Sequence, residues 1–200
     1  MYVIIENSEA EIVIKKSKFI AHTFKIESKE QAEEILQKNK KKYFDAKHNC
    51  YAYRIIQKDC SILEKSSDDG EPSKTAGSPM LDILKGKELV NVLVIVTRYF
   101  GGILLGTGGL VRAYSDACSL AIEKSKMREA KIVNKYEAEI SYQDLKKLKY
   151  LCEKENIKTE NETYNQNITI EIYAAEKEMQ TLASSINFLK LDEKEGNIII

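Results

Sequence analysis

The second half of the chain constrains the fold most, because its hydrophobic period switches between strand and helix in a definite order. Ile168, Ile170 and Ile172 alternate with polar residues, as in a half-buried strand. The predicted elements are a strand at 137–142, a helix capped by Asp144, strands at 157–164 and 168–173, a helix at 176–189 and a strand at 197–200. This β-α-β-β-α-β order is ferredoxin-like and places two helices on one face of an antiparallel sheet.

The first half of the chain also mixes strands and helices. Ser28 and Gln31 form a capping box at the start of one helix. The other predicted elements are strands at 11–15, 19–26, 49–56, 61–65 and 92–99, a short helix near 80–84 and a long helix at 110–126. We therefore expect an α+β protein of two domains, residues 1–130 and 135–200, that meet near 127–134 without a Gly/Pro linker.

Composition and charge narrow the class of protein. Hydrophobic residues make up 43% of the 200 residues and charged residues 31%, a balance typical of a soluble domain with a core. No apolar run approaches the roughly 20 residues that a membrane span needs, and the N-terminal segment is unlike a signal peptide. These features predict a cytoplasmic protein that does not interact with membranes.

Charge balance bears on nucleic-acid binding. Lys+Arg and Asp+Glu both number 31, so no net positive field attracts polyanions. A local basic patch is compatible with this balance, and one candidate runs through Lys38, Lys40, Lys41 and Lys42, with Lys47 further on. The alternative is a solvated helix end, where lysines also favour the helix dipole.

Metal and nucleophile motifs are missing from the sequence. The four cysteines have no C-x-x-C spacing, and neither His22 nor His48 belongs to an H-E-x-x-H pattern. No Ser/His/Asp or Cys/His set is evident. The sequence therefore predicts no metal and no cofactor, and it does not favour a hydrolase.

An acidic turn carries Asp68, Asp69 and Glu71 beside Gly70 and Pro72. Clustered carboxylates can hold a hard divalent cation through oxygen, but the spacing is not that of a calcium loop. Hydrogen bonds from these carboxylates to the nearby backbone are the favoured interpretation.

A glycine-rich turn separates the buried strand at 92–99 from the long helix that follows. Its glycines are Gly101, Gly102, Gly106, Gly108 and Gly109. Such turns let backbone N–H groups converge on an anion at a helix N-terminus. Thr107 stands where a P-loop has lysine, and the third glycine of the dinucleotide fingerprint is missing. A generic anion site and a close-packing turn both remain open.

Two arginines flank this turn. Arg98 ends the buried strand, and Arg112 lies one turn inside the helix. A guanidinium suits phosphate or carboxylate groups. The arginines are predicted either to bind an anion or to form internal ion pairs with Asp68, Asp69 or Glu71, and the second interpretation is slightly favoured.

Longer motifs in the first half are similar to those of a known family. They are KSKFIA at 16–21, HNCYAYR at 48–54, SDDGEP at 67–72, TAGSP at 75–79, NVLVIVTRYFGG at 91–102 and LGTGGLVRAY at 105–114. On these motifs the chain resembles the YigZ/IMPACT family in its two-domain bacterial form. Lys74 departs from the family, which usually has glycine there.

The resemblance implies a fold and a field of activity. The first domain should share the fold of ribonuclease PH and of domain IV of elongation factor G, with a rare left-handed β-α-β crossover. The second domain should resemble domain V of that factor. Eukaryotic members regulate translation by binding the ribosome-associated activator of an amino-acid starvation kinase. Bacteria lack that kinase pathway, so this partner does not transfer to a bacterial form.

Two functions follow as hypotheses. The first is a non-enzymatic, translation-linked protein that presents Arg98, Arg112, the acidic turn and the glycine turn to RNA or a ribosome-associated partner. The second is an enzyme acting on a phosphorylated or peptide substrate between the same loops. Some bacterial relatives carry a proline dipeptidase label, but the metal-ligand pattern of such an enzyme is missing here.

Overall fold

The computed structural model describes residues 1–57 and 59–200 and divides the chain into two compact units. Unit 1 comprises Met1–Ala130 and unit 2 comprises Lys131–Ile200. Each unit combines helices with an antiparallel sheet, which confirms the predicted α+β class. Within the described residues, no helix has the length and apolar content required to cross a membrane.

Unit 1 is built on a five-stranded sheet in which every neighbouring pair is antiparallel. In spatial order its strands are β2 (Ser8–Ile14), β3 (Ser17–Lys25), β6 (Val92–Tyr99), β4 (His48–Ile56) and β5 (Ile62–Ser67). The antiparallel order brings the end of β6 beside the starts of β3 and β4. We call this end of the sheet, where β6 leads into Gly101 and Gly102, the glycine end.

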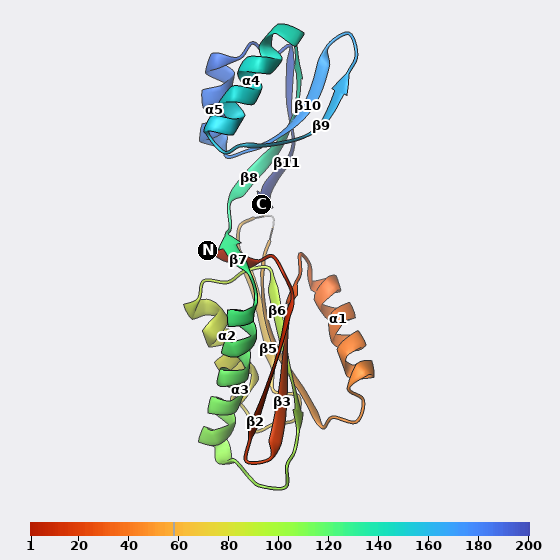
Figure 1. The fold of residues 1–200 in the computed structure, drawn as a ribbon, viewed down its shortest axis with the longest axis vertical. Coiled ribbons are helices and arrows are strands. Elements are labelled where there is room, and N and C mark those ends of the chain that lie inside the picture. The colour runs from red at the N-terminus through yellow and green to blue at the C-terminus, as the bar shows by residue number, and fades with distance from the viewer. Residues whose placement is uncertain (58) are drawn as a thin grey trace. The chain divides into compact units, whose positions relative to one another are not determined.

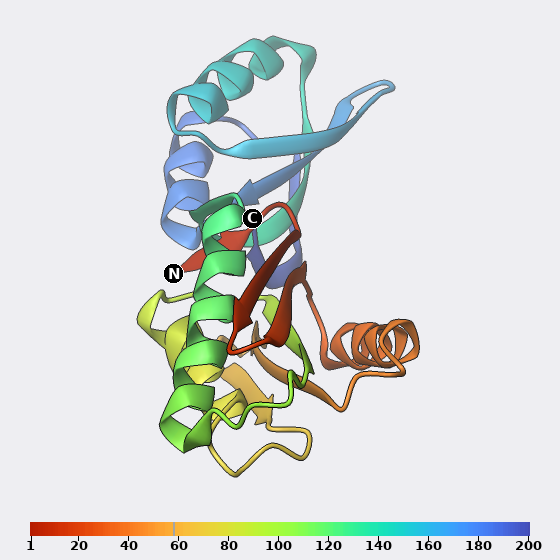
Figure 2. The same ribbon diagram turned by 60° about the horizontal axis from the view of Figure 1, so that its bottom comes forward.

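Helices cover both faces of this sheet. Helices α2 (Gly77–Gly86) and α3 (Gly106–Lys124) lie on one face, and α1 (Lys29–Lys42) lies on the other (Figures 1 and 2). Alternate residues of β6 pack into two separate cores, with Val94 toward α2 and α3 and Leu93 toward α1. Burial on both faces explains why β6 is an almost continuous apolar run.

Two features of unit 1 differ from the sequence-based expectation. Strands β1 (Tyr2–Ile4) and β7 (Met127–Glu129) pair with each other, and at three residues each they are too short for a recognisable period. Helix α3 begins at Gly106 instead of Leu110, so Gly108 and Gly109 occupy its first turn. Glycine is a poor helix former, so the sequence pattern placed these residues in the turn.

Unit 2 has the predicted ferredoxin-like order. Its strands, in spatial order, are β11 (Lys190–Ile199), β8 (Ile132–Ile140), β10 (Ile168–Ala174) and β9 (Lys158–Tyr164), and its helices are α4 (Tyr142–Lys154) and α5 (Glu176–Ser185). Both helices cover one face of the sheet (Figure 1), where Ile168, Ile170 and Ile172 are fully buried. The cap of α4 is Ser141, whose hydroxyl accepts a hydrogen bond from the Asp144 backbone, and not Asp144 itself.

The cysteines are all free thiols and differ in exposure. Cys50, Cys118 and Cys152 are buried, whereas Cys60 is exposed in the turn between β4 and β5. Burial raises the pKa of Cys118 to about 12 and that of Cys152 to about 11. Burial also raises the pKa of Cys50, so the three buried thiols stay protonated at neutral pH. Cys118 and Cys152 pack as apolar side chains, whereas the Cys50 thiol donates a hydrogen bond to the Asp68 carbonyl.

Candidate functional site

The strand register brings three side chains together at the glycine end. Arg98 of β6 lies directly opposite Phe19 on β3 and His48 on β4. Residues that face each other across adjacent strands point to the same side of the sheet. That side is the one covered by α2 and α3, so the sheet delivers Arg98 and His48 toward the start of α3.

Arg98 forms a buried ion pair with the acidic turn. Its Nη1 donates a hydrogen bond to Glu71 Oε1 at 2.6 Å, and the Tyr114 hydroxyl donates to the same oxygen at 2.8 Å. Arg98 and Glu71 are only 6% and 8% exposed. His48 Nε2 lies 4.0 Å from that oxygen, while its Nδ1 donates to the Asp69 carbonyl. The ion-pair interpretation of Arg98 is confirmed, with Glu71 as the partner.

The other acids of the turn hold the backbone in place. Asp68 accepts hydrogen bonds from the backbone N–H groups of Lys74, Ala76 and Gly77, at 2.8–3.0 Å, at the start of α2. Asp69 Oδ2 accepts from the Asn49 backbone at 2.7 Å. These contacts confirm the predicted backbone role of the acidic turn.

The backbone conformation at position 74 explains why the family usually has glycine where this chain has Lys74. Its φ is 62°, in the left-handed region that glycine enters without strain. The lysine keeps this conformation while its N–H bonds Asp68.

We expect Asp68→Ala to lower the free energy of unfolding by about 2–3 kcal/mol, because three backbone N–H groups lose a charged acceptor. Urea denaturation measures the change. The control is Asp82→Ala on the exposed side of α2, which should stay within about 0.5 kcal/mol of the parent. Equal effects of the two substitutions would contradict the capping role.

The five glycines of the turn have different roles. A Cβ atom on Gly101 would lie 2.0 Å from the Lys16 carbonyl carbon, so this glycine permits close backbone packing. Gly102 and Gly106 have φ values of 83° and 71°, which favour glycine. Gly108 faces open space. Packing and conformational demands therefore account for the first three.

A hollow of about 400 Å³ opens beside the start of α3, and we call it the α3 hollow. The polar side chains of its wall are those of Lys47, His48, Glu71 and Arg98. The apolar side chains are those of Phe100, Leu104, Leu105 and Leu110, and the first residues of α3, Gly106 and Thr107, complete the lining. The volume falls within the range of about 300–1,000 Å³ that is usual for small-molecule pockets.

Uncapped backbone groups meet this hollow. The N-cap of α3 is Leu105, which makes no side-chain hydrogen bond, and the first turn of the helix contains no acidic residue. The first N–H groups of a helix lack intrahelical partners and carry the positive end of its dipole. The α3 hollow therefore combines a helix N-terminus with the Lys47 and Arg98 cations.

The structure separates the predicted basic residues. Arg112 is exposed and has no ion pair among the described residues, so it does not share the Arg98 acid partner. Lys47 lines the α3 hollow, whereas Lys41 and Lys42 end α1. The sequence analysis did not assign His48 to the pocket. The feature that places it there is the β4–β6 register, in which His48 lies opposite Arg98.

Unpaired cations concentrate at the glycine end despite the zero net charge. Within residues 1–57 and 59–130, those at or near this end without a salt bridge are Lys15, Lys16, Lys47, Lys74 and Arg112. Of the nearby acids, Glu71 pairs with Arg98, whereas Asp68 and Asp69 accept backbone hydrogen bonds and Asp45 accepts one from the Tyr99 hydroxyl. The glycine end therefore presents five cations that form no ion pair among the described residues, beside acids whose oxygens are engaged in hydrogen bonds.

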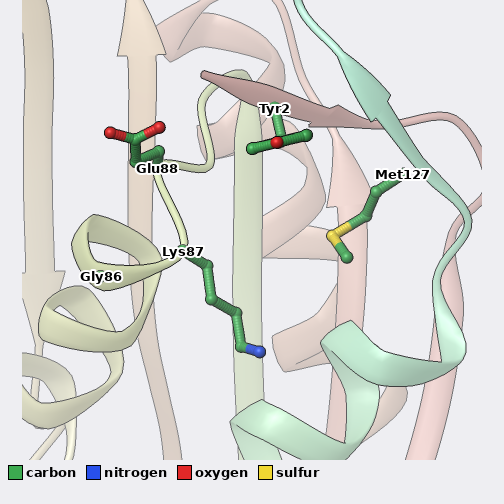
Figure 3. A pocket seen from close by; sticks show the side chains of 5 residues that line it. All are labelled: Tyr2, Gly86, Lys87, Glu88 and Met127. Carbon is green, nitrogen blue, oxygen red and sulfur yellow. The ribbon is translucent and has the colours of Figure 1, made fainter.

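A second hollow, of about 320 Å³, lies between the end of α2 and the short β1–β7 sheet. Figure 3 shows Lys87 and Met127 pointing into it, with the Glu88 carboxylate turned away. Tyr2 and Met127 are about half exposed. With one ammonium group and no helix N-terminus, this hollow is a weaker anion site than the α3 hollow.

Comparison with known proteins gives consistent matches along the chain. The Impact N-terminal domain matches residues 15–122, and a domain of unknown function (DUF1949) matches residues 139–187. IMPACT family member YvyE of Bacillus subtilis is 39% identical over 96% of this chain and 89% of its own length. An IMPACT family member of Haemophilus influenzae is 34% identical over 94% of this chain and 89% of its own.

A solved structure has a similar fold over nearly the whole chain. The crystal structure of a hypothetical protein aligns with 96% of this chain and 98% of its own, at a TM-score of 0.66 and 28% identity. The Impact domain match includes Arg98, Glu71 and the glycine end. These matches span both units, and the chain belongs to the IMPACT family.

Proposed function

We propose that this protein is a non-enzymatic, translation-linked regulator in the cytoplasm that binds RNA or a ribosome-associated partner through the glycine end of unit 1. The observation that carries the proposal is the coincidence of unpaired cations with the open N-terminus of α3. Family membership supports the link to translation, since the resemblance of the motifs to the YigZ/IMPACT family implies the translational role of its eukaryotic members.

The charge distribution limits how RNA is held. Cations such as Lys16, Lys47 and Arg112 can each approach a phosphate, and no global field assists them. We therefore infer a local interface of moderate affinity that engages few phosphates.

Unit 2 offers a poorer surface for RNA. On the sheet face away from its helices, Lys135 pairs with Glu171 at 2.8 Å and Lys194 pairs with Glu137 at 3.0 Å. These lysines are already neutralised, so they release few counterions on meeting a phosphate. This supports assigning the interface to unit 1.

RNA binding should depend on the glycine end in a salt-dependent way. Arg112→Ala is expected to weaken binding of a short single-stranded RNA and to lower the salt slope by about one unit. The matched control is Arg128→Ala on β7, another exposed arginine without a salt bridge in the described chain, which should leave the slope unchanged. Fluorescence anisotropy across a salt series measures both.

Two outcomes would contradict this interface. Equal losses for Arg112→Ala and Arg128→Ala would show binding without a defined surface. If RNA does not bind, crosslinking and pulldown from cells with RNase treatment tests the ribosome-associated protein partner. Failure of both experiments would overturn the proposal.

An enzyme is the second candidate, because His48, Glu71 and Arg98 line one hollow. Against this role, Glu71 Oε1 already accepts two hydrogen bonds and His48 Nδ1 is engaged with Asp69. Turnover of phosphomonoester or dipeptide substrates that His48→Ala abolishes would favour the enzyme over the binding protein.

A further inference from the structure

We propose that the α3 hollow binds the phosphorylated end of an RNA strand, with a terminal phosphomonoester at the start of α3 and the adjoining base against Phe100. The inference rests on the proposed RNA-binding function and names the chemical group that unit 1 recognises. It draws on the free donors of Arg98, the uncapped helix, the local charge and the apolar wall.

Arg98 has donors to spare. A guanidinium carries five N–H groups, and the hydrogen bond described for this one runs from Nη1 to Glu71. Its Nε is buried and has no hydrogen-bond partner in the described structure, and the residue as a whole is only 6% exposed. Arg98 lines the hollow, and the N–H groups of its Nη atoms beyond the one bonded to Glu71 are the donors available to the acceptor oxygens of a ligand.

The start of α3 supplies a second set of donors. Gly106 and Thr107 line the hollow, and Leu105 offers the helix no side-chain acceptor. A phosphoryl group at this position would receive backbone hydrogen bonds and the favourable end of the dipole. Lys47, an exposed residue of the polar wall, adds an ammonium group.

Local charge favours one phosphate over a chain of them. Glu71 neutralises Arg98 within the hollow, which leaves Lys47 and the helix N-terminus as the surplus. An internal stretch of RNA would bring several phosphates past the Glu71 carboxylate. A single terminal group, which carries up to two negative charges on adjacent oxygens, concentrates its charge at the donors.

The apolar wall suits the nucleoside next to that phosphate. Phe100 is 51% exposed, and its ring lies 5.6 Å from the Arg98 guanidinium carbon. Leu104, on the same wall, is 82% exposed. Exposed aromatic rings provide stacking platforms for unpaired bases in RNA-binding proteins.

The test compares RNA ends on the whole protein. Anisotropy is measured with one short single-stranded RNA carrying a 5′-phosphate, a 3′-phosphate or hydroxyl groups at both ends. We expect the RNA with a phosphorylated end to bind about tenfold more tightly than the form with hydroxyl ends. A tenfold change in Kd is the size of effect that one set of charge-assisted hydrogen bonds contributes. A nucleoside monophosphate should compete, and inorganic phosphate should compete more weakly because it lacks the base.

Thr107→Glu separates binding from folding. Thr107 is exposed near the start of α3, where a carboxylate favours the helix dipole, so the melting temperature should hold or rise. The same carboxylate repels phosphate and should remove the advantage of the phosphorylated end. Thr107→Gln is the neutral control of similar size and should retain it. Phe100→Ala should weaken the competition by a nucleoside monophosphate more than that by inorganic phosphate.

The outcomes distinguish this inference from the function on which it rests. If all three RNAs bind equally and Arg112→Ala still weakens them, the end-specific pocket is overturned and the RNA-binding interface stands. If Thr107→Glu leaves the preference intact, the α3 hollow is not its source. If none of the RNAs binds, both the inference and the RNA form of the proposed function fail.

Discussion

Replacing Glu71 with alanine is expected to lower the free energy of unfolding by about 3–5 kcal/mol, the largest effect of any single carboxylate in unit 1. The substitution leaves the Arg98 charge buried beneath α3 without its partner and deprives the Tyr114 hydroxyl of its acceptor. Since small proteins are stable by only about 5–15 kcal/mol, this loss is a large fraction of the total. Urea denaturation followed by circular dichroism measures it.

A double-mutant cycle isolates the ion pair. Glu71→Ala combined with Arg98→Met removes both charges, so the double variant should be less destabilised than the two single losses added together. Glu71→Gln keeps an oxygen that can accept from Tyr114 and should be milder than alanine. Simple additivity of the Glu71 and Arg98 substitutions would show that the buried pair contributes no coupling.

Gly101→Ala should be the other strongly destabilising substitution, at about 3 kcal/mol or more. The added methyl group would lie 2.0–2.4 Å from backbone atoms of Lys16 and Ser17, and backbone cannot rotate away as a long side chain can. The hydrogen bond from Gly101 N–H to Ser17 Oγ would be disturbed as well. The thermal melting temperature should fall markedly.

Gly108→Ala is the matched control for this prediction. The same methyl group meets no atom within 4 Å there, because Gly108 lies in the open first turn of α3. Alanine should stabilise the helix by about 0.5–1 kcal/mol through its higher propensity. If both alanines lowered the melting temperature alike, close packing at Gly101 would not be the cause.

Local periodicity was sufficient to predict much of this fold. The alternation of Ile168, Ile170 and Ile172 reports burial on one sheet face, and the order of elements around it determined the architecture of unit 2. The three-residue strands β1 and β7 escaped prediction because their pairing joins distant parts of the chain. The early start of α3 escaped it because tertiary context overrides the low helix propensity of glycine.

The candidate site was predictable in its parts and not in its assembly. Opposite charges near in sequence indicated that Arg98 would pair with an acid of the turn, and Glu71 is that acid. Nothing local shows that His48 lies opposite Arg98, because the β4–β6 register connects residues 50 positions apart. The α3 hollow exists only once that register, the acidic turn and the start of α3 are in place.

Because the four thiols differ in burial, Cys60 can be labelled selectively in the unmodified sequence. Of the four cysteines, all of which lie within the described residues, Cys60 alone is exposed. A maleimide dye at neutral pH should therefore attach there and spare Cys50, Cys118 and Cys152, with no cysteine removed by mutation. The β4–β5 turn lies at the opposite end of the sheet from the α3 hollow. A fluorophore on Cys60 would thus follow the tumbling of unit 1 without occupying the surface on which RNA is expected to dock.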